Sequence, residues 1–342
     1  MIKLFCPGPV NMIDSIKNIE IKEICHRGNH FQELYKKCVN VTMKLFNITN
    51  DDYTCLFLNG SGTLSIEAMI YSYLKNIKVL ILQNGGFSEK WEKVLSSYST
   101  NYDCINFGWN NEFDYEQIKS KIKNNKYDCI LFVHHETSTT MINDIYKLNE
   151  LCNSFNINIA ADIVSSVGFY EFDLQKLNKV ILLGYSTNKC IGIYPGLAIN
   201  ICKTELFNNM NNNISYLNLK NYYDFYLLNE TPYTTCYQNY YYYYAAIENL
   251  LINIKEIRTD YIIQKNYLKN ELKKKGITTS IEDNVQCIWV VNFKYNNEII
   301  YNKLLENNII IYKCKGPLAK THIQIAIYNK TIQDIDNLVN FF

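Results

Sequence analysis

The first candidate for chemistry in this chain is a turn of small residues that follows a strand pattern. Residues 53–58 are predicted to form a strand, and the turn Gly60-Ser61-Gly62-Thr63 leads from it into a helical pattern over residues 64–74. Such a turn presents backbone N–H groups and hydroxyl groups at the positive end of a helix, which suits a phosphate group. Because a Gly-Ser turn at a helix start is more often only a turn, this interpretation depends on what else lies nearby.

A carboxylate and a lysine follow two later strand patterns. Asp162 ends a predicted strand over residues 158–162, and Lys189 follows another over residues 179–184. Taken singly, Asp162 could cap a helix and Lys189 could be a surface lysine. Ligands of open α/β sheets collect at the carboxyl ends of the strands, so the turn, the carboxylate and the lysine are expected to meet. Together they supply the contacts of pyridoxal phosphate: a phosphate cradle, a partner for the pyridinium nitrogen and an amine for a Schiff base.

The residues around these candidates alternate between short apolar runs and amphipathic stretches. Strands are predicted over residues 53–58, 78–82, 127–134, 158–162, 179–184 and 196–201, and helices over residues 64–74, 89–97 and 144–155. This alternation predicts an α/β fold with a mostly parallel, layered sheet. After a helical pattern over residues 245–257, the tail alternates again, with strands over residues 286–293, 309–312 and 322–327 and a helix over 298–307. We therefore expect an N-terminal arm (1–14), a large domain (15–245) and a small α+β domain (246–342).

Composition and charge argue against several classes of function. The 342 residues include 34 Lys plus Arg and 33 Asp plus Glu, and the net charge of +1 disfavours a general nucleic-acid binder. Apolar residues make up 48% and charged residues 20%, as in an ordinary globular protein. No apolar run approaches the roughly 18 residues that span a bilayer, and the first residues lack the pattern of a secretion signal. We therefore expect a cytoplasmic protein with no membrane or nucleic-acid partner.

The 12 cysteines and the paired histidines do not predict a metal site. No two cysteines have the Cys-x-x-Cys spacing of zinc or redox motifs, so reduced thiols are expected. His134 and His135 are neighbours in a strand pattern and point to opposite faces, which favours structural roles. The tyrosine run over residues 240–244 has no interleaved basic residues, which favours a buried or dimer-interface segment over a nucleotide-stacking surface.

The motifs, taken in order, resemble those of the class V, fold-type I, pyridoxal-phosphate-dependent aminotransferases over nearly the whole chain. The motifs that carry the resemblance are Pro7-Gly8-Pro9, His26-Arg27-Gly28, Gly60-Ser61-Gly62-Thr63, Asn84-Gly85-Gly86-Phe87, His134-His135-Glu136-Thr137-Ser138, Ala161-Asp162-Ile163-Val164-Ser165-Ser166 and Asn188-Lys189-Cys190-Ile191. The last motif and the His-Arg pair are most similar to the 2-aminoethylphosphonate–pyruvate aminotransferase branch. The resemblance implies a large domain with a mostly parallel seven-stranded sheet, a smaller C-terminal α+β domain and a homodimer with shared active sites.

The resemblance also implies roles for residues around the cofactor ring. Lys189 would carry the Schiff base, and Asp162 would keep the ring nitrogen protonated. Phe87 would stack on the ring, and Thr137 or Ser138 would donate a hydrogen bond to the ring hydroxyl. The ring would then serve as an electron sink over a lysine that moves protons.

A second group of matching residues would hold the cofactor phosphate. In the same subunit these residues are Ser61, Gly62 and Thr63, helped by Ser186. Thr235 lies where relatives reach the phosphate in the other subunit of the dimer. The resemblance thus predicts a phosphate site to which two subunits contribute.

One position departs from the family pattern and bears on the substrate. Relatives place an arginine in the small domain that grips the substrate carboxylate, and Gln324 stands at the matching position here. A neutral amide cannot replace that cation, so either another cation or another substrate is implied. The candidate cations are Arg27, Lys315, Lys320 and His322, and Asn188 is a further substrate-binding candidate because it precedes the lysine where relatives use a polar side chain.

The resulting hypothesis is an aminotransferase that moves an amino group from a small amine, 2-aminoethylphosphonate in the first place, to a keto acid such as pyruvate. An alanine– or serine–glyoxylate/pyruvate-type aminotransferase is an alternative, and Gln324 leaves open a lyase or decarboxylase with the same cofactor. A cysteine desulfurase is disfavoured, because Phe87 and Asn188 stand where those enzymes have histidines. A catalytically silent scaffold is disfavoured by the retained Lys189 and Asp162.

Overall fold

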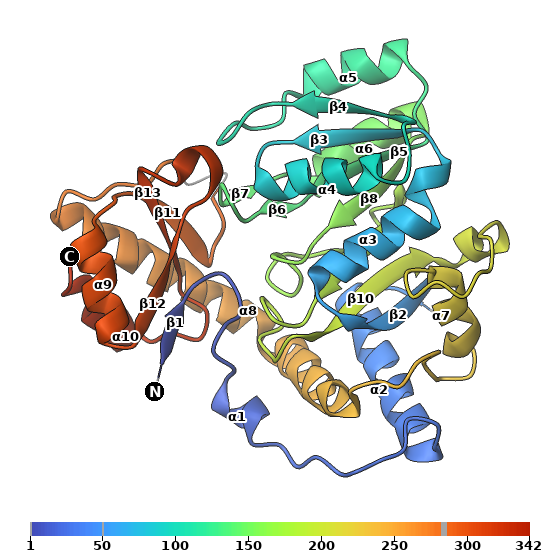
Figure 1. Ribbon diagram of the computed structural model, residues 1–342, viewed down its shortest axis with the longest axis horizontal. Helices are drawn as coiled ribbons and strands as arrows, with labels where there is room; N and C mark the ends of the chain where they lie inside the picture. Colours follow the sequence, from blue (N-terminus) through green and yellow to red (C-terminus); the bar gives the residue numbers. More distant parts are fainter. Residues whose placement is uncertain (1, 50, 282–285) are drawn as a thin grey trace.

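A sheet of seven strands forms the centre of the larger domain (Figure 1). The computed structural model describes residues 2–49, 51–281 and 286–342. The strands lie in the order β2-β10-β9-β8-β5-β3-β4; β10 pairs antiparallel with both neighbours and the other pairs are parallel. Their bounds are β2 Tyr53–Gly60, β3 Val79–Gln83, β4 Tyr102–Asn106, β5 Cys129–Val133, β8 Asn158–Asp162, β9 Val180–Ser186 and β10 Gly196–Lys203. The predicted α/β fold with a mostly parallel seven-stranded sheet is confirmed.

Helices cover both faces of this sheet, which explains why its strands are nearly continuous apolar runs. Successive side chains of a strand point to opposite faces, so Leu80 and Leu82 enter one apolar cluster and Val79 and Ile81 enter the other. The first cluster includes residues of α2, α5 and α6, and the second includes residues of α3, α4 and α7. The bounds are α2 Asn29–Leu45, α3 Gly62–Ser72, α4 Gly86–Ser96, α5 Tyr115–Asn124, α6 Ile145–Phe155 and α7 Leu219–Tyr226, with short 3-10 helices at η1 Leu74–Asn76 and η2 Thr204–Asn208.

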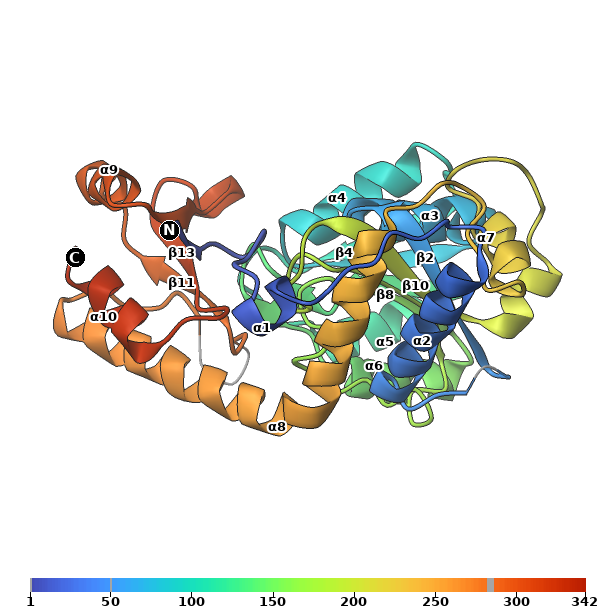
Figure 2. The ribbon, with the colours of Figure 1, turned by 90° about the horizontal axis from the view of Figure 1, so that it is seen from below.

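The smaller domain is built on a four-stranded sheet in the order β1-β12-β13-β11. Its elements are β1 Lys3–Phe5, β11 Val290–Lys294, α9 Glu298–Glu306, β12 Ile309–Lys313, η4 Gly316–Leu318, β13 His322–Ala326 and α10 Ile332–Val339. The helix α8 Tyr237–Lys274, 38 residues long, runs from the large domain to the small one (Figure 2). Neither α8 nor any other helix within the described ranges is long and apolar enough to span a bilayer.

The predicted elements match the observed ones most closely in the central sheet. The strand predicted over residues 158–162 has those bounds as β8, whereas the helix predicted over 245–257 is only the middle of α8. The tyrosine run therefore lies in the first turns of α8, where Tyr240 and Tyr243 are fully buried against the sheet. The domain boundary proposed at residue 245 falls inside this unbroken helix.

The N-terminal arm connects the small domain to the centre of the molecule. Its strand β1 pairs parallel with β12, and the chain then turns toward the large domain and the short helix α1 Asp14–Lys17 (Figure 1). Asn11 fixes this turn, because its side chain accepts a hydrogen bond from Leu4 N at 2.8 Å and donates one to Ile2 O at 3.1 Å.

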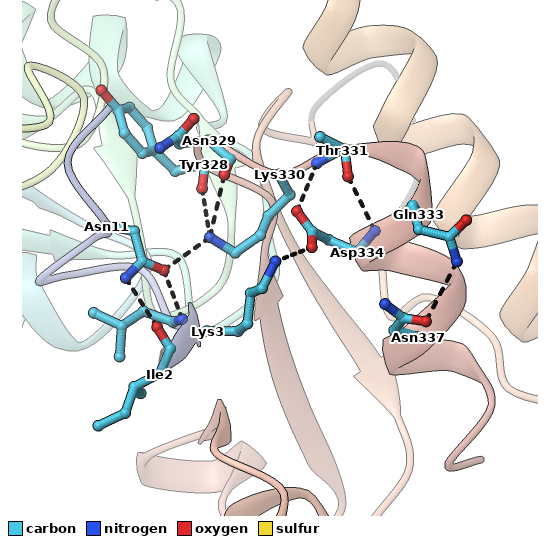
Figure 3. Close-up of polar contacts among 11 residues, drawn as sticks. Ile2, Lys3, Asn11, Tyr328, Asn329, Lys330, Thr331, Gln333, Asp334 and Asn337 are labelled. Carbon is cyan, nitrogen blue, oxygen red and sulfur yellow. Dashed lines mark hydrogen bonds and ion pairs between the residues drawn. The ribbon is translucent and has the colours of Figure 1, made fainter. Parts of the chain in front are cut away.

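A buried lysine ties the arm to the small domain (Figure 3). Lys330 Nζ donates to Asn11 Oδ1 at 3.1 Å and to Tyr328 O at 2.9 Å. Burial lowers the pKa of Lys330 to about 8, and the nearby Asp334 carboxylate opposes that change. Asp334 itself forms an ion pair with Lys3 of β1. The arm is thus held by polar contacts as well as by strand pairing.

Replacing Asn11 tests this attachment. We expect Asn11→Ala to lower the free energy of unfolding by about 1–3 kcal/mol, because it removes hydrogen bonds to the arm and leaves the buried Lys330 with fewer acceptors. Chemical denaturation measures the change, and hydrogen exchange at the Leu4 amide should accelerate. Asn18→Ala, at an exposed position just after α1, is the matched control. Equal effects of the two variants would contradict the role of Asn11 in attaching the N-terminal arm.

Candidate active site

A cavity of about 240 Å³ lies at the carboxyl ends of the central strands, between the large domain and the small one. Asp162 ends β8 and Ser186 ends β9, and both contribute to its wall. The arm contributes Pro7 and Gly8 to the same cavity. The structure brings together there the following residues predicted from the sequence: Ser61, Gly62, Thr63, Phe87, Thr137, Ser138, Asp162, Ser186, Asn188, Lys189 and Gln324.

The carboxylate of Asp162 is buried and held by two N–H groups. Its Oδ2 accepts a hydrogen bond from Trp91 Nε1 at 2.9 Å, and its Oδ1 accepts one from Val164 N at 2.9 Å. Burial raises the pKa of Asp162 to about 6, and the two hydrogen bonds and the Lys189 charge oppose the rise. The group therefore remains a carboxylate at neutral pH. Trp91, which orients it from α4, was not identified from the sequence.

Lys189 brings an amine into the same cavity. Its Nζ donates to Ser165 Oγ at 3.0 Å and lies 4.9 Å from the centroid of the Phe87 ring. Burial lowers the pKa of Lys189, although the Asp162 carboxylate acts in the opposite direction. An amine whose pKa is lowered loses its proton more readily, and the neutral amine is the nucleophilic form.

Two glycines allow backbone to approach these groups closely. The arm passes Lys189 at Gly8, whose φ is +147° and where a Cβ atom would stand 3.0 Å from Lys189 Cγ. Gly62 begins α3, and a Cβ atom there would stand 2.7 Å from Val164 Cγ2. Ser61 precedes the helix in an extended conformation, so the free N–H groups of the first turn of α3 lie at the cavity. This arrangement suits an anion.

A buried glutamate that the sequence interpretation left without a role organises the aromatic side of the cavity. Glu136 accepts hydrogen bonds from Phe87 N and Ser88 N at the start of α4, and from Ser138 Oγ at 2.6 Å. A carboxylate at a helix N-terminus is favoured by the helix dipole. Glu136 thereby fixes Phe87 and Ser138 relative to each other. Its position inside the His-His-Glu-Thr-Ser motif was the available signal.

Gln324 occupies the small-domain wall of the cavity but has no free donor. Its Nε2 donates to Thr137 O at 2.6 Å and to Asn292 Oδ1 at 2.8 Å. Asn292 Nδ2 in turn donates to Ser138 O at 2.9 Å, which fixes the orientation of the Asn292 amide. One N–H group of Gln324 therefore joins β13 to Thr137 of the large domain, and the other is used by Asn292 of the neighbouring strand β11, whose own amide bonds to Ser138 of the large domain. The expected substrate-binding residue acts in this chain as a tie between the domains.

Arg27 and Thr235 do not line this cavity, and neither do the candidate cations Lys320 and His322. The Arg27 guanidinium forms an ion pair with Glu230 at 2.7 Å and donates to Pro232 O at 3.2 Å. Thr235 Oγ1 donates to Asn59 Oδ1, at the end of β2. Thr235 was expected to act in the other subunit, so its position outside the cavity of its own chain agrees with that expectation without testing it.

The paired histidines are buried, and burial lowers the pKa of each to about 3. His135 lines the cavity, and its Nδ1 lies 2.7 Å from Ser165 O, so Nδ1 carries the proton. Among the residues that the structure describes, no group of His, Cys, Asp or Glu has the arrangement of a metal site.

Comparison with known proteins assigns the chain to a family. The model of the class-V aminotransferase family matches residues 13–325, and the chain belongs to this family. The predicted resemblance is therefore confirmed at the family level.

Curated relatives carry names from phosphonate metabolism. A bifunctional phosphonoacetaldehyde hydrolase/aminoethylphosphonate transaminase of Clostridioides difficile is 25% identical over 91% of this chain and 51% of its own length. A 2-aminoethylphosphonate–pyruvate transaminase of Bacillus cytotoxicus is 28% identical over 59% of this chain and 56% of its own length. The chain thus spans about half the length of the curated relatives it matches.

Solved structures share the fold over the whole chain. Alanine–glyoxylate aminotransferase from Nostoc sp. has a TM-score of 0.91 at 19% identity and covers 99% of this chain and 94% of its own. Ureidoglycine–glyoxylate aminotransferase from Bacillus subtilis has a TM-score of 0.90 at 20% identity and covers 100% of this chain and 92% of its own. At these identities the likeness establishes the fold-type I architecture.

Replacing Gln324 tests its role as a tie. We expect Gln324→Leu to lower the free energy of unfolding by about 1–3 kcal/mol, because Thr137 O and Asn292 Oδ1 lose a buried donor. Chemical denaturation gives the value. Gln333→Leu on the exposed face of α10 is the control for the change of side chain. A loss no greater than that of the control would show that the two hydrogen bonds contribute nothing to domain joining.

Proposed function

We propose that this protein is a pyridoxal-phosphate-dependent aminotransferase that transfers an amino group from 2-aminoethylphosphonate to a keto acid such as pyruvate. The observation that carries the proposal is that a buried carboxylate, Asp162, and a half-buried amine, Lys189, line one cavity beside the free N-terminus of α3. The family of the chain and the names of its curated relatives support it.

The residues of the cavity fit pyridoxal phosphate. The raised pKa of Asp162 reflects a buried negative charge that is only partly compensated, and a protonated ring nitrogen would compensate it. Phe87 offers an apolar face for the ring, and Gly62 leaves room for a phosphate at the start of α3. Thr137, Ser138 and Ser186 add hydroxyl groups. When bound, the cofactor supplies an electron sink for charge that develops at the substrate carbon.

Lys189 is the group that would move protons in this reaction. Ser165 Oγ holds Nζ in the cavity, and burial favours the neutral amine, which attacks a carbonyl carbon and accepts a proton. Once an incoming amine has taken the place of Lys189 on the cofactor, Nζ would be free to accept the proton from the substrate carbon. It would donate this proton to the carbon on the other side of the substrate nitrogen. Such proton transfer by a positioned group contributes typically about 10²–10⁴-fold to a rate.

Asp162 would stay ionised while the amine of Lys189 reacts. Trp91 Nε1 and Val164 N hold its two oxygens, so the carboxylate keeps its orientation without the help of water. A fixed negative charge in a buried site stabilises an adjacent cation more than it would in water.

The anionic end of the amino donor needs a cation, and Lys315 is the candidate that the cavity offers. Among the described lining residues, Lys315 is the cation besides Lys189, and Gln324 has no free donor. Lys313 is paired with Glu298 at 2.8 Å, and burial lowers the pKa of His322. A single lysine favours a compact, multiply charged anion, because it acts as a point charge, unlike the planar fork of an arginine.

We also infer that the protein forms a homodimer. A homodimer is supported by exposed apolar residues of the large domain, with Ile214 94%, Leu227 62% and Leu228 59% exposed in the single chain. In that dimer Thr235 would reach the phosphate of the partner's site.

An alanine– or serine–glyoxylate/pyruvate-type activity is the second candidate function, favoured by the fold neighbours. If amines fail to convert the cofactor to its aminated form, the protein would instead be assigned as a lyase or decarboxylase that uses the same cofactor.

Replacing Lys189 tests the assignment of the reactive amine. The wild-type protein with pyridoxal phosphate should show a visible absorption band that borohydride bleaches, and Lys189→Ala should lose that sensitivity. Transamination should fall by at least about 10²-fold, because the positioned proton carrier is lost. Lys119→Ala, at an exposed position of α5, should leave both properties unchanged. Full activity of Lys189→Ala would end the proposal.

Replacing Lys315 tests the recognition of the donor. We expect Lys315→Gln to raise the KM for 2-aminoethylphosphonate by about 10- to 100-fold, because a charge-assisted hydrogen bond contributes about 1.5–3 kcal/mol. The activity with propylamine, which has no anionic group, should change little. Lys320→Gln is the matched control in the same exposed segment. If KM rises with Lys320→Gln or Arg27→Gln and not with Lys315→Gln, the residue whose replacement raises KM binds the anionic group of the donor, and Lys315 does not.

A further inference from the structure

A lysine outside the predicted motifs points at the proposed phosphate cradle. Lys90 lies on α4, and its Nζ donates a hydrogen bond of 2.7 Å to Thr63 Oγ1 in the first turn of α3. Thr63 lines the cavity, and the Lys90 ammonium is hydrogen-bonded to Thr63 without lining the cavity itself. The side chain is partly buried, which places the charge next to the site rather than in bulk water.

This ammonium has no carboxylate partner among the residues that the structure describes. Its Nζ contacts the Thr63 hydroxyl and the face of the Trp91 ring, whose centroid lies 4.8 Å from Nζ. Burial lowers the pKa of Lys90, and the Asp162 and Glu67 charges only partly oppose that effect. A partly buried cation with three donors and one hydroxyl acceptor is poorly satisfied, and an anion in the cradle would satisfy it.

The spacing on α4 explains why the lysine lies there. Phe87, Lys90 and Trp91 are separated by three and four positions, which places them on one face of the helix. Phe87 lines the cavity, and Trp91 binds the Asp162 carboxylate. One face of α4 therefore carries the residue proposed to stack on the cofactor ring, the residue that binds the Asp162 carboxylate and the residue that contacts the phosphate cradle.

We propose that Lys90, acting with Thr63, binds the phosphate group of the cofactor and supplies the positive charge of the cradle. The inference rests on the proposed function and deepens it. The other groups of the cradle are N–H and hydroxyl groups, which carry no full charge, whereas the phosphate is a dianion near neutral pH. Lys90 thus sets the preference of the site for the phosphorylated form of the vitamin over the unphosphorylated form.

The experiment compares binding of two ligands that differ only in the phosphate. Apo-protein is titrated with pyridoxal phosphate and with pyridoxal, and binding is followed by tryptophan fluorescence and absorbance. We expect Lys90→Gln to weaken binding of pyridoxal phosphate by about 10- to 100-fold, the value of one charge-assisted hydrogen bond, and to change binding of pyridoxal by less than about threefold. Lys90→Arg, which keeps the charge, should retain most of the affinity. Lys93→Gln, exposed on the same helix, is the matched control.

The outcomes separate this inference from the proposed function. If the wild-type protein binds neither ligand, the proposed function fails. If it binds pyridoxal phosphate and Lys90→Gln binds it equally well, the role of Lys90 is refuted while the proposed function stands. If Lys90→Gln loses both ligands to the same extent, the lysine acts on the shape of the site rather than on the phosphate, which also refutes the inference. A melting curve of each apo-variant verifies folding, and Lys90→Arg serves as the folded reference if Lys90→Gln does not fold.

Discussion

The site depends on two groups of opposite charge in one cavity, the buried Asp162 and the half-buried Lys189. Asp162 and Lys189 each favour the ionised form of the other, while burial favours the neutral form of both. In the described part of the chain, each group bonds to neighbours instead of to its opposite: Asp162 to Trp91 and Val164, and Lys189 to Ser165. Paired burial of charge is costly unless hydrogen bonds satisfy both partners. The surroundings thus keep the two groups apart and leave their charges available to a ligand.

Contacts from several parts of the chain fix the walls of that cavity. The start of α4 is bound by the buried Glu136 carboxylate, which also holds Ser138. The opposite wall comes from β13, where Gln324 is bonded to the large domain. The arm passes Lys189 at Gly8 after its strand has joined the small sheet. Segments from the beginning, the middle and the end of the chain are therefore needed to form one site.

The sequence predicted six of the seven strands of the central sheet, all but the edge strand β4, and most of the residues that line the cavity, because these depend on local patterns. Strands such as β8 are short apolar runs that end at a polar residue, and Asp162 and Lys189 follow such ends. The helices α2 and α5 were missed although their polar and apolar residues follow a helical period. Trp91 was missed because its role depends on a tertiary contact with Asp162 that no spacing in the sequence reveals. For the same reason, the sequence did not reveal that the Gln324 amide bonds to Thr137 and Asn292.

The helix α8 has a mechanical consequence for the whole chain. Its 38 residues, with a contour length of about 57 Å at a rise of 1.5 Å per residue, form one unbroken helix without glycine or proline that bends between the two domains (Figure 2). Its first half packs against α2 and its second half against α10. A cut near residue 245 would therefore interrupt this helix and expose apolar surface on both fragments. At this connection the two domains share one hydrogen-bonded helix, so a change in their relative orientation would have to change the bend of α8.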